Sequence, residues 1–560
     1  MNDLENKLFD QSWNYKNRDK IINRLRKTIY DVFIIGGGIT GAGVAREAAM
    51  RDLKVALVDM QDFATGTSSR SSKLAHGGIR YLAMGDLDLV HEATTERNWM
   101  REHCPTVRPI PFLFVELEDG KYKKRDIIGA CKIYDFLGEK DSKFKNYKKH
   151  KWYKPEEIFE IEPEFIREGN LGGAVYYDNN VDDARLTIET LKEAVIRGAD
   201  IVNYCKVKGY IKDNGKIIGV KCKDLENDLN FEAKSNLVVN ATGIWTDKLL
   251  ENYPKHIPKP LIRPTKGVHL QYLRKHIKNK MATIIRSITD DRAFFVLPRN
   301  NKFTIIGTTD TDYDGDLANP FCTKEDADYL INSVKHYFPT AELDYSNILS
   351  TYAGIRPLVM QKRKSESDIS RKHIIFFSDD GLLTITGGKL TAWRRMAEDL
   401  FKKVEEKGIF RDIRREKNFS KQKFLISIDR EEWLNKLKSM GVQLDEDIDH
   451  HLYQQYGRGA LKILEIIKED ESLKKRIFEE NDFIKAEIVY TLRNELTPHL
   501  IDVLCRRTEM SLWIPHKKAF EIAKIISGLM AKEYSWTEEK KNNEIEMYLK
   551  YVKETVSFIK

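Results

Sequence analysis

Apolar and polar positions between residues 31 and 59 predict four elements in unbroken succession: a strand, a glycine turn, a helix and a second strand. Residues 32–35 (VFII) form a continuous apolar run, which is typical of a strand buried on both faces. The second strand, at residues 54–58, ends in Asp59. The rest of the chain is most simply understood as being organised around this unit.

The turn of this unit carries Gly36, Gly38 and Gly41 at the spacing G-x-G-x-x-G. In dinucleotide-binding folds the first glycine allows the tight turn, the second lets a pyrophosphate approach the backbone, and the third brings helix and strand together. Asp59 follows about 20 residues later, where such units bind the adenosine ribose 2′-hydroxyl. Because all four elements and the terminal acid are present, dinucleotide binding is favoured over a plain glycine-rich turn.

Residues 61–82 (QDFATGTSSRSSKLAHGGIRYL) are rich in glycine and small hydroxyl residues and have little apolar periodicity. Cations are interspersed with residues that let the backbone approach a ligand. Because the segment leaves from the ribose end of the unit, it is interpreted as a long ordered loop and not as a flexible linker.

Later patterns predict more of the same domain and a second sheet. The predicted segments are an amphipathic helix at 182–200, a strand and glycine turn at 237–247, several strands between 264 and 312, and strand, glycine and helix patterns at 351–358 and 382–404. The run of strands indicates an antiparallel sheet beside the nucleotide domain. Beyond about residue 410 charged helical patterns dominate.

The predicted fold class is therefore α/β, and α+β overall. It has a Rossmann-like nucleotide-binding domain built from discontinuous segments, an antiparallel-sheet substrate domain and an all-helical C-terminal domain. The predicted boundaries are 28–105, 175–260 and 350–408 for the nucleotide-binding domain, 106–174 and 261–349 for the substrate or cap domain, 409–560 for the helical domain, and 1–27 for a basic N-terminal extension.

Length and composition restrict the number of domains, the cellular compartment and the kinds of site that the chain can have. A chain of 560 residues is too long for one core, and its net charge of +8 selects no particular partner. The six cysteines form no C-x-x-C pair, which argues against a disulfide framework or zinc site and fits a reducing cytoplasm. No metal site is expected, since His450 and His451 are interpreted as exposed helix residues. Neither a membrane span nor a signal peptide is predicted.

Two basic regions leave alternatives open. Residues 16–29 place isoleucine and leucine at helical spacing among arginine and lysine, so the helix could lie on anionic lipid or pack against its own domain. Residues 121–154 interleave lysine with aromatic residues, a composition that suits nucleic acid, a membrane interface or a solvated insertion. Internal packing and the solvated insertion are favoured.

From the residues alone, the single G-x-G-x-x-G motif is compatible with NAD or FAD. Asp59, the acid expected at the ribose, disfavours NADP. The single complete unit, followed by a hydroxyl-rich loop and distant glycine turns, favours a flavin. Isolated cations beside glycines indicate an anionic substrate, because guanidinium groups bind phosphate or carboxylate through paired hydrogen bonds. These candidates are Arg80, Lys266, His269, Arg356, Arg371 and Lys389.

The motifs IIGGGITGAG, TSSRSSKLAHGGIRYL, DDARL, NATGIW, TKGVH, IIGTTDTDYDGD, GIRPL, ISRK and GGKLTAWRRMAE occur in this order. Together they closely resemble the FAD-dependent glycerol-3-phosphate dehydrogenases, and most of all the bacterial branch typified by bacilli. The resemblance covers roughly residues 28–405. One departure is Ile244, where the family pattern has proline after the glycine of NATG.

The resemblance implies oxidation of sn-glycerol 3-phosphate to dihydroxyacetone phosphate, with hydride passing from C2 to flavin N5. It implies that Arg80, Arg356 and Lys389 hold the phosphate, with Tyr81 and Arg371 as further candidates. His269 is the expected base for the C2 hydroxyl, since an imidazole titrates near working pH. A structural hydrogen bond is the equal alternative for His269, and a bond to the flavin ring is the alternative for Lys389.

The resemblance also implies the FAD-binding residues. They are expected to be Gly36, Gly38, Gly41 and Asp59 at the pyrophosphate and ribose, Thr67, Ser68, Ser69, Ser72 and Leu74 alongside, Ala241 and Gly243 near the adenosine half, and Gly388 and Thr391 near the ring.

The electron acceptor separates two closely related enzymes: a dehydrogenase reduces membrane quinone, and an oxidase reduces oxygen. Oxidases of this family carry a large insertion in the middle of the chain, and the short spacing between GVH and GTTD favours the dehydrogenase. Quinone reduction implies a cytoplasmic protein peripherally bound to an anionic membrane surface. A flavin amine or amino-acid oxidase and a nucleic-acid-binding adaptor are alternatives. No nucleic-acid partner is expected, and a homodimer is left open.

Overall fold

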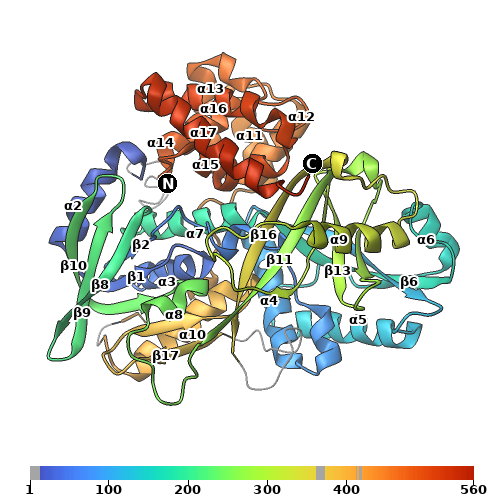
Figure 1. Ribbon diagram of the computed structural model, residues 1–560, viewed down its shortest axis with the longest axis horizontal. Helices are drawn as coiled ribbons and strands as arrows, with labels where there is room; N and C mark the ends of the chain where they lie inside the picture. Colours follow the sequence, from blue (N-terminus) through green and yellow to red (C-terminus); the bar gives the residue numbers. More distant parts are fainter. Residues whose placement is uncertain (1–12, 361–372, 411–412, 415–418, 560) are drawn as a thin grey trace.

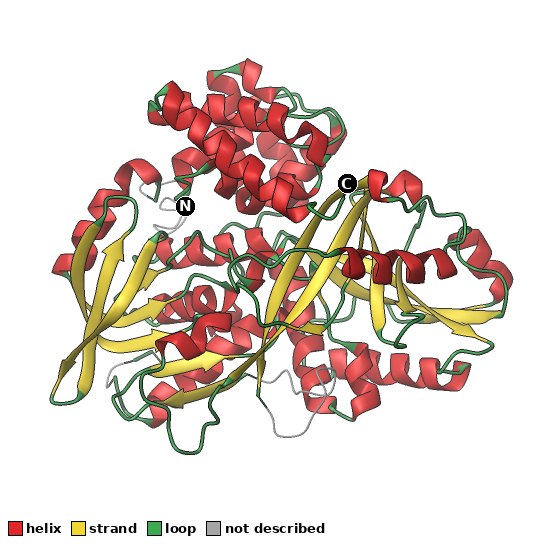
Figure 2. Cartoon of the chain, viewed as in Figure 1, coloured by secondary structure: helices red, strands yellow, loops and turns green. Residues whose placement is uncertain are grey.

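The computed structural model describes residues 13–360, 373–410, 413–414 and 419–559. They form a nucleotide-binding lobe and a substrate lobe side by side, with a helical lobe lying across both (Figures 1 and 2). Each lobe has a core of its own, and the lobes share interfaces. The predicted fold class is confirmed.

The first sheet contains the predicted unit at its centre. Its strand order is β17 (Ile374–Phe377), β18 (Leu383–Thr386), β10 (Leu229–Asn240), β1 (Ile29–Ile35), β2 (Val55–Val58) and β7 (Asp200–Val202). Neighbours from β18 to β7 are parallel, whereas β17 is antiparallel to β18. Val32, Phe33 and Ile34 are fully buried, as the apolar run predicts for a strand covered on both faces.

Three helices pack together against this sheet: α3 (Ile39–Met50), α7 (Asp183–Ile196) and α10 (Trp393–Glu406). An antiparallel extension, β8 (Cys205–Asp213) and β9 (Lys216–Asp224), continues from the first half of β10. The short helix α8 (Thr246–Leu249) follows β10. Since the parallel strands all end at one edge, their carboxyl ends and the turn before α3 border the same crevice.

The second sheet is mainly antiparallel. Its order is β15 (Thr311–Asp312), β11 (Ile262–Leu273), β14 (Phe303–Gly307), β13 (Ala293–Arg299), β12 (Ala282–Arg286), β4 (Val107–Leu117), β6 (Asn170–Val181) and β3 (Leu74–Ala75), with β16 (Ile348–Val359) on β11 and β5 (Lys151–Tyr153) on β6. The pair β12 and β4 is parallel. The surrounding helices are α4 (Leu87–His103), α5 (Lys124–Glu139), α6 (Pro155–Ile161) and α9 (Lys324–Tyr337).

Two strands cross the predicted domain boundaries. The boundary at residue 350 falls inside β16, which pairs with β11 in the substrate sheet, so the pattern at 351–358 is not a piece of the nucleotide sheet. The boundary at residue 175 likewise falls inside β6, which pairs with β4 along its length. Both strands are largely buried, and an apolar run does not reveal which sheet a strand joins. The chain returns to the nucleotide sheet at β17.

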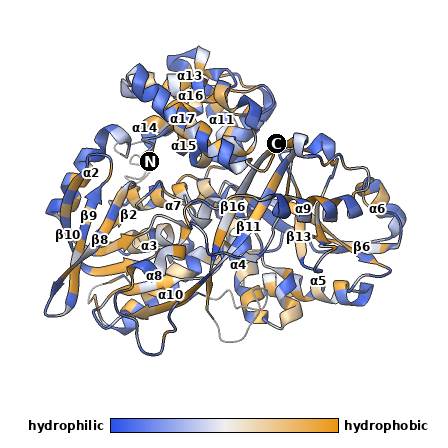
Figure 3. Ribbon diagram, in the orientation of Figure 1, coloured by the Kyte–Doolittle hydropathy of each residue, from blue (hydrophilic) through white to orange (hydrophobic). Residues whose placement is uncertain are grey.

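The C-terminal lobe is helical throughout its described part, apart from an isolated bridge between Arg476 and Ile484. Its helices are α11 (Arg430–Met440), α12 (Glu446–Tyr456), α13 (Gly459–Glu469), α14 (Lys485–Asn494), α15 (Leu500–Asp502), α16 (Ala519–Tyr534) and α17 (Glu538–Thr555). Ile488, Leu500 and Ile522 share one apolar cluster with Phe112 and Tyr176 of the substrate sheet. The hydropathy colouring shows apolar stretches alternating with polar ones along the helices of this lobe (Figure 3).

The basic N-terminal helix α2 (Arg18–Lys27) packs against its own domain. Ile21, Ile22 and Leu25 are buried in the core of the nucleotide lobe. Arg18 is also buried and forms an ion pair with Asp224 (2.7 Å). Because the apolar face of α2 is already covered, this helix offers no free amphipathic face to a lipid surface.

His499 of the helical lobe contacts Glu226 of the nucleotide lobe and Glu544 on α17 of its own lobe. Nε2 lies 3.1 Å from Glu226 and Nδ1 lies 2.8 Å from Glu544. Burial opposes protonation of His499, but these hydrogen bonds and the charge of Asp502 outweigh it and raise its pKa to about 10. The imidazolium therefore stabilises the docked state fully below pH 6.5, and this contribution is lost as pH rises towards 10.

We therefore expect H499Q to lower Tm most near pH 6 and progressively less as pH approaches 10. Thermal unfolding followed by circular dichroism at a series of pH values measures this difference. H256Q is the control, since His256 is exposed in a loop, and it should leave Tm unchanged. A Tm difference that stays constant from pH 6 to 10 contradicts the stabilising role of the imidazolium.

Candidate active site

A cavity of about 1200 Å³ runs from the glycine turn of the first sheet to the face of the second. This volume exceeds the roughly 300–1,000 Å³ of sites for drug-sized ligands. Its walls come from both sheets and from the loop at residues 61–82. The cavity is thus large enough to take an extended cofactor and a small substrate together.

The glycine turn is shaped by close backbone contacts. Gly36 has φ +110°, and a Cβ there would lie 2.6 Å from the Ala241 carbonyl oxygen. A Cβ on Gly41 would lie 1.9 Å from the Gly36 carbonyl oxygen, so α3 can approach the turn only without a side chain. Gly38 is the N-cap of α3 and lines the cavity. The helix dipole and amides therefore favour a phosphate at this point.

Asp59 closes the turn at the end of β2. Its carboxylate accepts hydrogen bonds from the backbone amides of Gly37 (2.6 Å) and Gln61 (2.9 Å). Burial raises the pKa of Asp59 to about 6, against the opposing effect of these two hydrogen bonds. Each oxygen keeps a further lone pair, so the ionised group can still accept from a ribose hydroxyl.

The loop at residues 61–82, called the serine loop from here on, lines the middle of the cavity. Thr67, Ser68, Ser72 and Leu74 all border it. The Ser68 hydroxyl accepts from the Ile39 amide (2.9 Å), and Thr67 donates to the Ile355 carbonyl (2.6 Å). These contacts tie the loop to α3 on one side and to β16 on the other.

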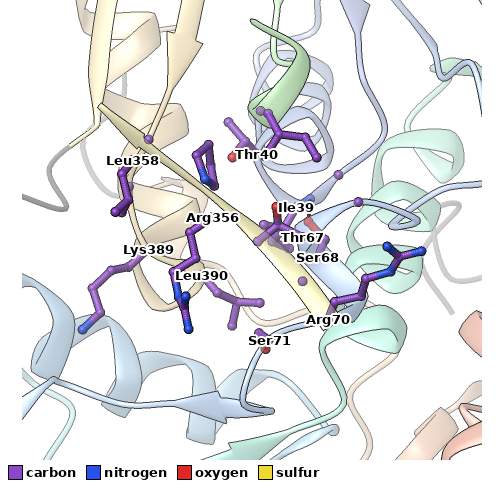
Figure 4. Close-up of a pocket in the computed structure, with 18 of the residues that line it drawn as sticks. Ile39, Thr40, Thr67, Ser68, Arg70, Ser71, Arg356, Leu358, Lys389 and Leu390 are labelled. Carbon is purple, nitrogen blue, oxygen red and sulfur yellow. Dashed lines mark hydrogen bonds between the residues drawn. The ribbon is translucent and has the colours of Figure 1, made fainter. Parts of the chain in front are cut away.

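Arg356 projects from β16 into the cavity, on the same side as Lys389 (Figure 4). Its Nη1 donates to Asp310 (2.8 Å), and its Nη2 donates to the Thr308 hydroxyl (2.9 Å) and the Thr309 carbonyl (3.0 Å). A Cβ on Gly267 would lie 2.2 Å from Nη2, so this glycine makes room for the guanidinium. The planar group is thus fixed before any ligand binds.

Lys389, Arg80 and Tyr81 form a second cationic group. The Lys389 ammonium lies 4.9 Å from the centre of the Tyr81 ring and 3.4 Å from the His76 carbonyl oxygen. The Arg80 guanidinium lies 5.2 Å from the centre of the same Tyr81 ring. All three residues line the cavity, so two segments far apart in the sequence place their cations at one ring.

His269 lies on β11, where its ring stacks on Tyr352 at 4.6 Å. Its Nε2 lies 2.9 Å from the Ser72 hydroxyl, and its buried Nδ1 has no hydrogen-bond partner among the described residues. Burial, with the charges of Arg356 and Lys73, lowers the pKa of His269 well below its usual range. The imidazole is therefore neutral and carries a lone pair that can accept a proton.

The structure brings most of the sequence candidates to this one cavity. Those that line it are Gly36, Gly38, Asp59, Thr67, Ser68, Ser72, Leu74, Arg80, Tyr81, Ala241, Gly243, His269, Arg356, Gly388, Lys389 and Thr391. Gly41 and Ser69 do not line it, although Gly41 shapes the turn. Lys266 forms an ion pair with Asp326 instead (2.6 Å). Arg371 lies outside the described residues.

Sequence reasoning missed several residues that support the site. Asp310 and Thr308 orient Arg356, and the Tyr352 ring stacks on the imidazole of His269. Asp310 belongs to the motif IIGTTDTDYDGD. An acid directly after two threonines could have indicated in the sequence a group that orients a cation. The role of Tyr352 depends on pairing between β11 and β16, which the sequence does not show.

The cavity fits a dinucleotide at one end and a small anion at the other. The glycine turn is a cradle that a side chain would fill, and it opens onto the start of α3. The opposite end gathers Arg80, Arg356 and Lys389 beside a neutral imidazole. Fold and site together define a dinucleotide-dependent oxidoreductase acting on an anionic substrate.

Comparison with known proteins agrees with this class. A family model described as FAD dependent oxidoreductase matches residues 31–394, and one described as the C-terminal domain of alpha-glycerophosphate oxidase matches residues 384–541. The chain therefore belongs to the FAD dependent oxidoreductase family, and its cofactor is FAD.

The similar proteins in this family include aerobic glycerol-3-phosphate dehydrogenases and an alpha-glycerophosphate oxidase. The aerobic glycerol-3-phosphate dehydrogenase of Bacillus subtilis is 36% identical over 559 residues, covering 96% of this chain and 97% of the relative. The alpha-glycerophosphate oxidase of Streptococcus pneumoniae is 34% identical, covering 94% and 96%. The glycerol-3-phosphate dehydrogenase of Bacillus halodurans, solved with FAD, superposes with a TM-score of 0.78 at 29% identity over 98% and 99%. The resemblance found in the motifs is confirmed.

Proposed function

We propose that the chain oxidises sn-glycerol 3-phosphate to dihydroxyacetone phosphate. The observation that carries this proposal is the meeting of Arg80, Arg356 and Lys389 with a neutral His269 in one cavity. Three cations suit a phosphate dianion, and the imidazole suits a neighbouring hydroxyl. The names of the similar proteins support the same substrate.

In this proposal the protein binds and orients the phosphate through Arg356, which Asp310 and Thr308 hold in place, and through Lys389 and Arg80. The chemistry that FAD supplies when bound is two-electron oxidation, in which a hydride leaves C2 as the C2–O bond becomes a carbonyl. His269 takes up the hydroxyl proton at Nε2, directly or through the Ser72 hydroxyl bonded to it. Gly36, Gly38, Asp59 and the serine loop hold the cofactor.

The test is the visible spectrum of the purified protein under anaerobic conditions, before and after sn-glycerol 3-phosphate is added. Bleaching of the flavin band supports the proposal. A flavin band that persists with this substrate but bleaches with an amino acid contradicts it and supports an amino-acid oxidase. Glycerol without phosphate is the matched control, because it lacks the group that the three cations bind.

We propose membrane quinone as the electron acceptor. The alignment with the pneumococcal oxidase spans 594 positions, more than the 560 residues of this chain, so that oxidase carries residues without counterparts here. Its similarity nevertheless makes oxygen the second candidate. Adding a short-chain quinone or oxygen to the anaerobically reduced protein distinguishes the two, since the physiological acceptor should reoxidise the flavin faster.

We further propose that helix α5 contacts an anionic membrane surface. Phe136 and Ile133 on α5 are 64% and 44% exposed, and Met84, at the cavity wall, is 45% exposed. Exposed lysines surround this helix: Lys121, Lys132, Lys140, Lys143, Lys145, Lys148 and Lys149. Apolar side chains within a basic fringe suit an anionic lipid interface. Among the described residues no helix is long and apolar enough to cross a membrane.

Sedimentation with vesicles tests this surface. Wild-type protein should bind vesicles that contain anionic lipid, and the double variant I133S/F136S should bind them more weakly. L225S is the control, because Leu225 is an exposed apolar residue on the nucleotide lobe. Equal binding of all three proteins contradicts the assignment of the membrane surface to α5.

We expect R356K to raise KM for sn-glycerol 3-phosphate by roughly 10- to 100-fold, because lysine loses the planar pair of donors, each charge-assisted bond being worth about 1.5–3 kcal/mol. Steady-state kinetics with an artificial acceptor measure the change. R263K is the matched control, since Arg263 forms a similar two-point contact with Asp312 in the same sheet but does not line the cavity. An unchanged KM in R356K excludes a phosphate-binding role.

A further inference from the structure

A buried ionic cluster joins the helical lobe to the serine loop. Lys73 of the loop, Asp183 at the start of α7 and Glu509 before the turn η12 (Met510–Leu512) are at most 2% exposed. The Lys73 ammonium donates to both carboxylates and to the Ser69 carbonyl (2.7 Å). All three of its protons are therefore used inside the protein.

The cluster is not suited to a metal ion. Asp182, Asp183 and Glu509 place their oxygens close enough together to hold one. The Lys73 ammonium already forms ion pairs with two of these acids, Asp183 and Glu509. Lys73 is thus the cation that this group of acids holds.

The same cluster fixes the backbone of the serine loop. Asp183 accepts from the Ser71 amide (3.1 Å) and hydroxyl (2.6 Å), and the Lys73 amide donates to the Ser71 hydroxyl (3.1 Å). Ser72 lies between these two anchored residues. Its hydroxyl is therefore presented to the imidazole of His269, 2.9 Å away.

A second path from the cluster reaches the same imidazole. The Tyr352 hydroxyl donates to the Ser71 carbonyl (2.8 Å), and the Tyr352 ring stacks on His269 with the planes 14° apart. The Lys73 ammonium lies 5.4 Å from the centre of that ring. Displacing Lys73 would thus disturb both neighbours of the imidazole.

The backbone at both ends of the ion pair indicates that it is held under constraint. Lys73 has φ +55° and Glu509 has φ +52°, a left-handed conformation that residues with a side chain rarely adopt. Such a conformation is unfavourable and persists where surrounding contacts enforce it. The contacts of the cluster supply that enforcement.

We propose that Glu509 is a positioning residue for the reaction. By holding Lys73 it keeps Ser71 and Ser72 in place, so that Ser72 and Tyr352 orient the imidazole of His269. The helical lobe thereby contributes to the active site without lining the cavity. This inference rests on the proposed role of His269 in the oxidation of sn-glycerol 3-phosphate.

The test compares E509Q with E495Q in FAD-loaded protein. Glu495 is a matched control, because it is also buried, belongs to the helical lobe and binds Arg185 of α7 (2.6 Å), yet it does not contact the serine loop. For E509Q we expect flavin reduction about 10- to 100-fold slower per bound flavin, with KM unchanged, since a small misplacement of a catalytic group has that effect. E495Q should lower Tm but keep the rate.

Hydrogen exchange measured by mass spectrometry provides a readout that is independent of turnover. E509Q should lose amide protection in the peptide containing residues 69–75, whereas E495Q should keep it. E509D retains the carboxyl group and should recover part of the rate and protection; it also serves if E509Q does not fold.

Two outcomes overturn the inference: an equal loss of rate in E509Q and E495Q, or unchanged exchange of residues 69–75 in E509Q and E509D. If wild-type protein is not reduced by sn-glycerol 3-phosphate, the proposed function fails. The exchange comparison then still decides whether Glu509 holds the loop.

Discussion

Replacing His269 by glutamine is expected to slow reduction of the bound flavin by about 100- to 10,000-fold, the range that a general base contributes. The amide can still bond to Ser72, but it has no lone pair that accepts a proton at working pH. Anaerobic stopped-flow spectroscopy with sn-glycerol 3-phosphate measures the rate. The flavin content and KM should change little, because the cations and the glycine turn are untouched.

The pH dependence adds a second criterion for His269. Its pKa lies well below 6.5 because of burial and the charges of Arg356 and Lys73. A base must be unprotonated to act, so the rate in wild-type protein should hold between pH 8 and pH 6.5 and fall only at lower pH.

The control for H269Q is H91Q. His91 donates a hydrogen bond from Nδ1 to the Leu137 carbonyl (2.8 Å) and does not line the cavity, so it is a histidine with a structural bond only. If H269Q reduces its flavin as fast as H91Q does, the structural interpretation of His269 is correct and another group is the base.

Replacing Gly41 by alanine is expected to give protein that lacks bound FAD. The new Cβ would lie 1.9 Å from the Gly36 carbonyl oxygen, which is backbone and cannot rotate away. Forcing α3 from the turn should cost at least about 1–3 kcal/mol, or roughly 5- to 150-fold in FAD affinity. The absorbance ratio of flavin to protein after purification, followed by titration of FAD, measures the loss.

G129A is the control for this substitution. Gly129 lies within α5, and a Cβ there would meet no atom within 4 Å. Alanine in a helix interior should stabilise by about 0.5–1 kcal/mol, and the protein should stay fully yellow. A G41A protein that retains FAD at the wild-type level would show that the turn tolerates a wider separation from α3.

The cofactor end of the cavity could be predicted from the sequence more completely than the substrate end. Gly36, Gly38 and Asp59 lie on one continuous unit, so their spacing alone places them at one site. The substrate end depends on pairs that are distant in sequence. Lys266 also lies near a glycine in the sequence, as Arg356 does, yet it forms an ion pair with Asp326 on helix α9, and only the fold shows this.

The same limit explains the assignment of β16 and the absence of Glu509 from the candidates. A strand buried on both faces has the same pattern in either sheet, so residues 351–358 could not be allocated by periodicity. Glu509 and Lys73 are separated by 436 positions and lie in segments with no shared motif. Their contact follows from how the lobes dock, which local patterns do not encode.

The shared core of the helical lobe and the substrate sheet also means that, during synthesis, the sheet emerges before the helices that complete its core. Phe112 and Tyr176 share an apolar cluster with residues such as Ile488 and Leu500, which are translated several hundred residues later. At about 5–20 residues per second, several hundred residues take of the order of tens of seconds to follow. During that time the sheet is translated but uncovered, so the nascent chain should depend on a chaperone, and stop codons late in the message should yield aggregated protein.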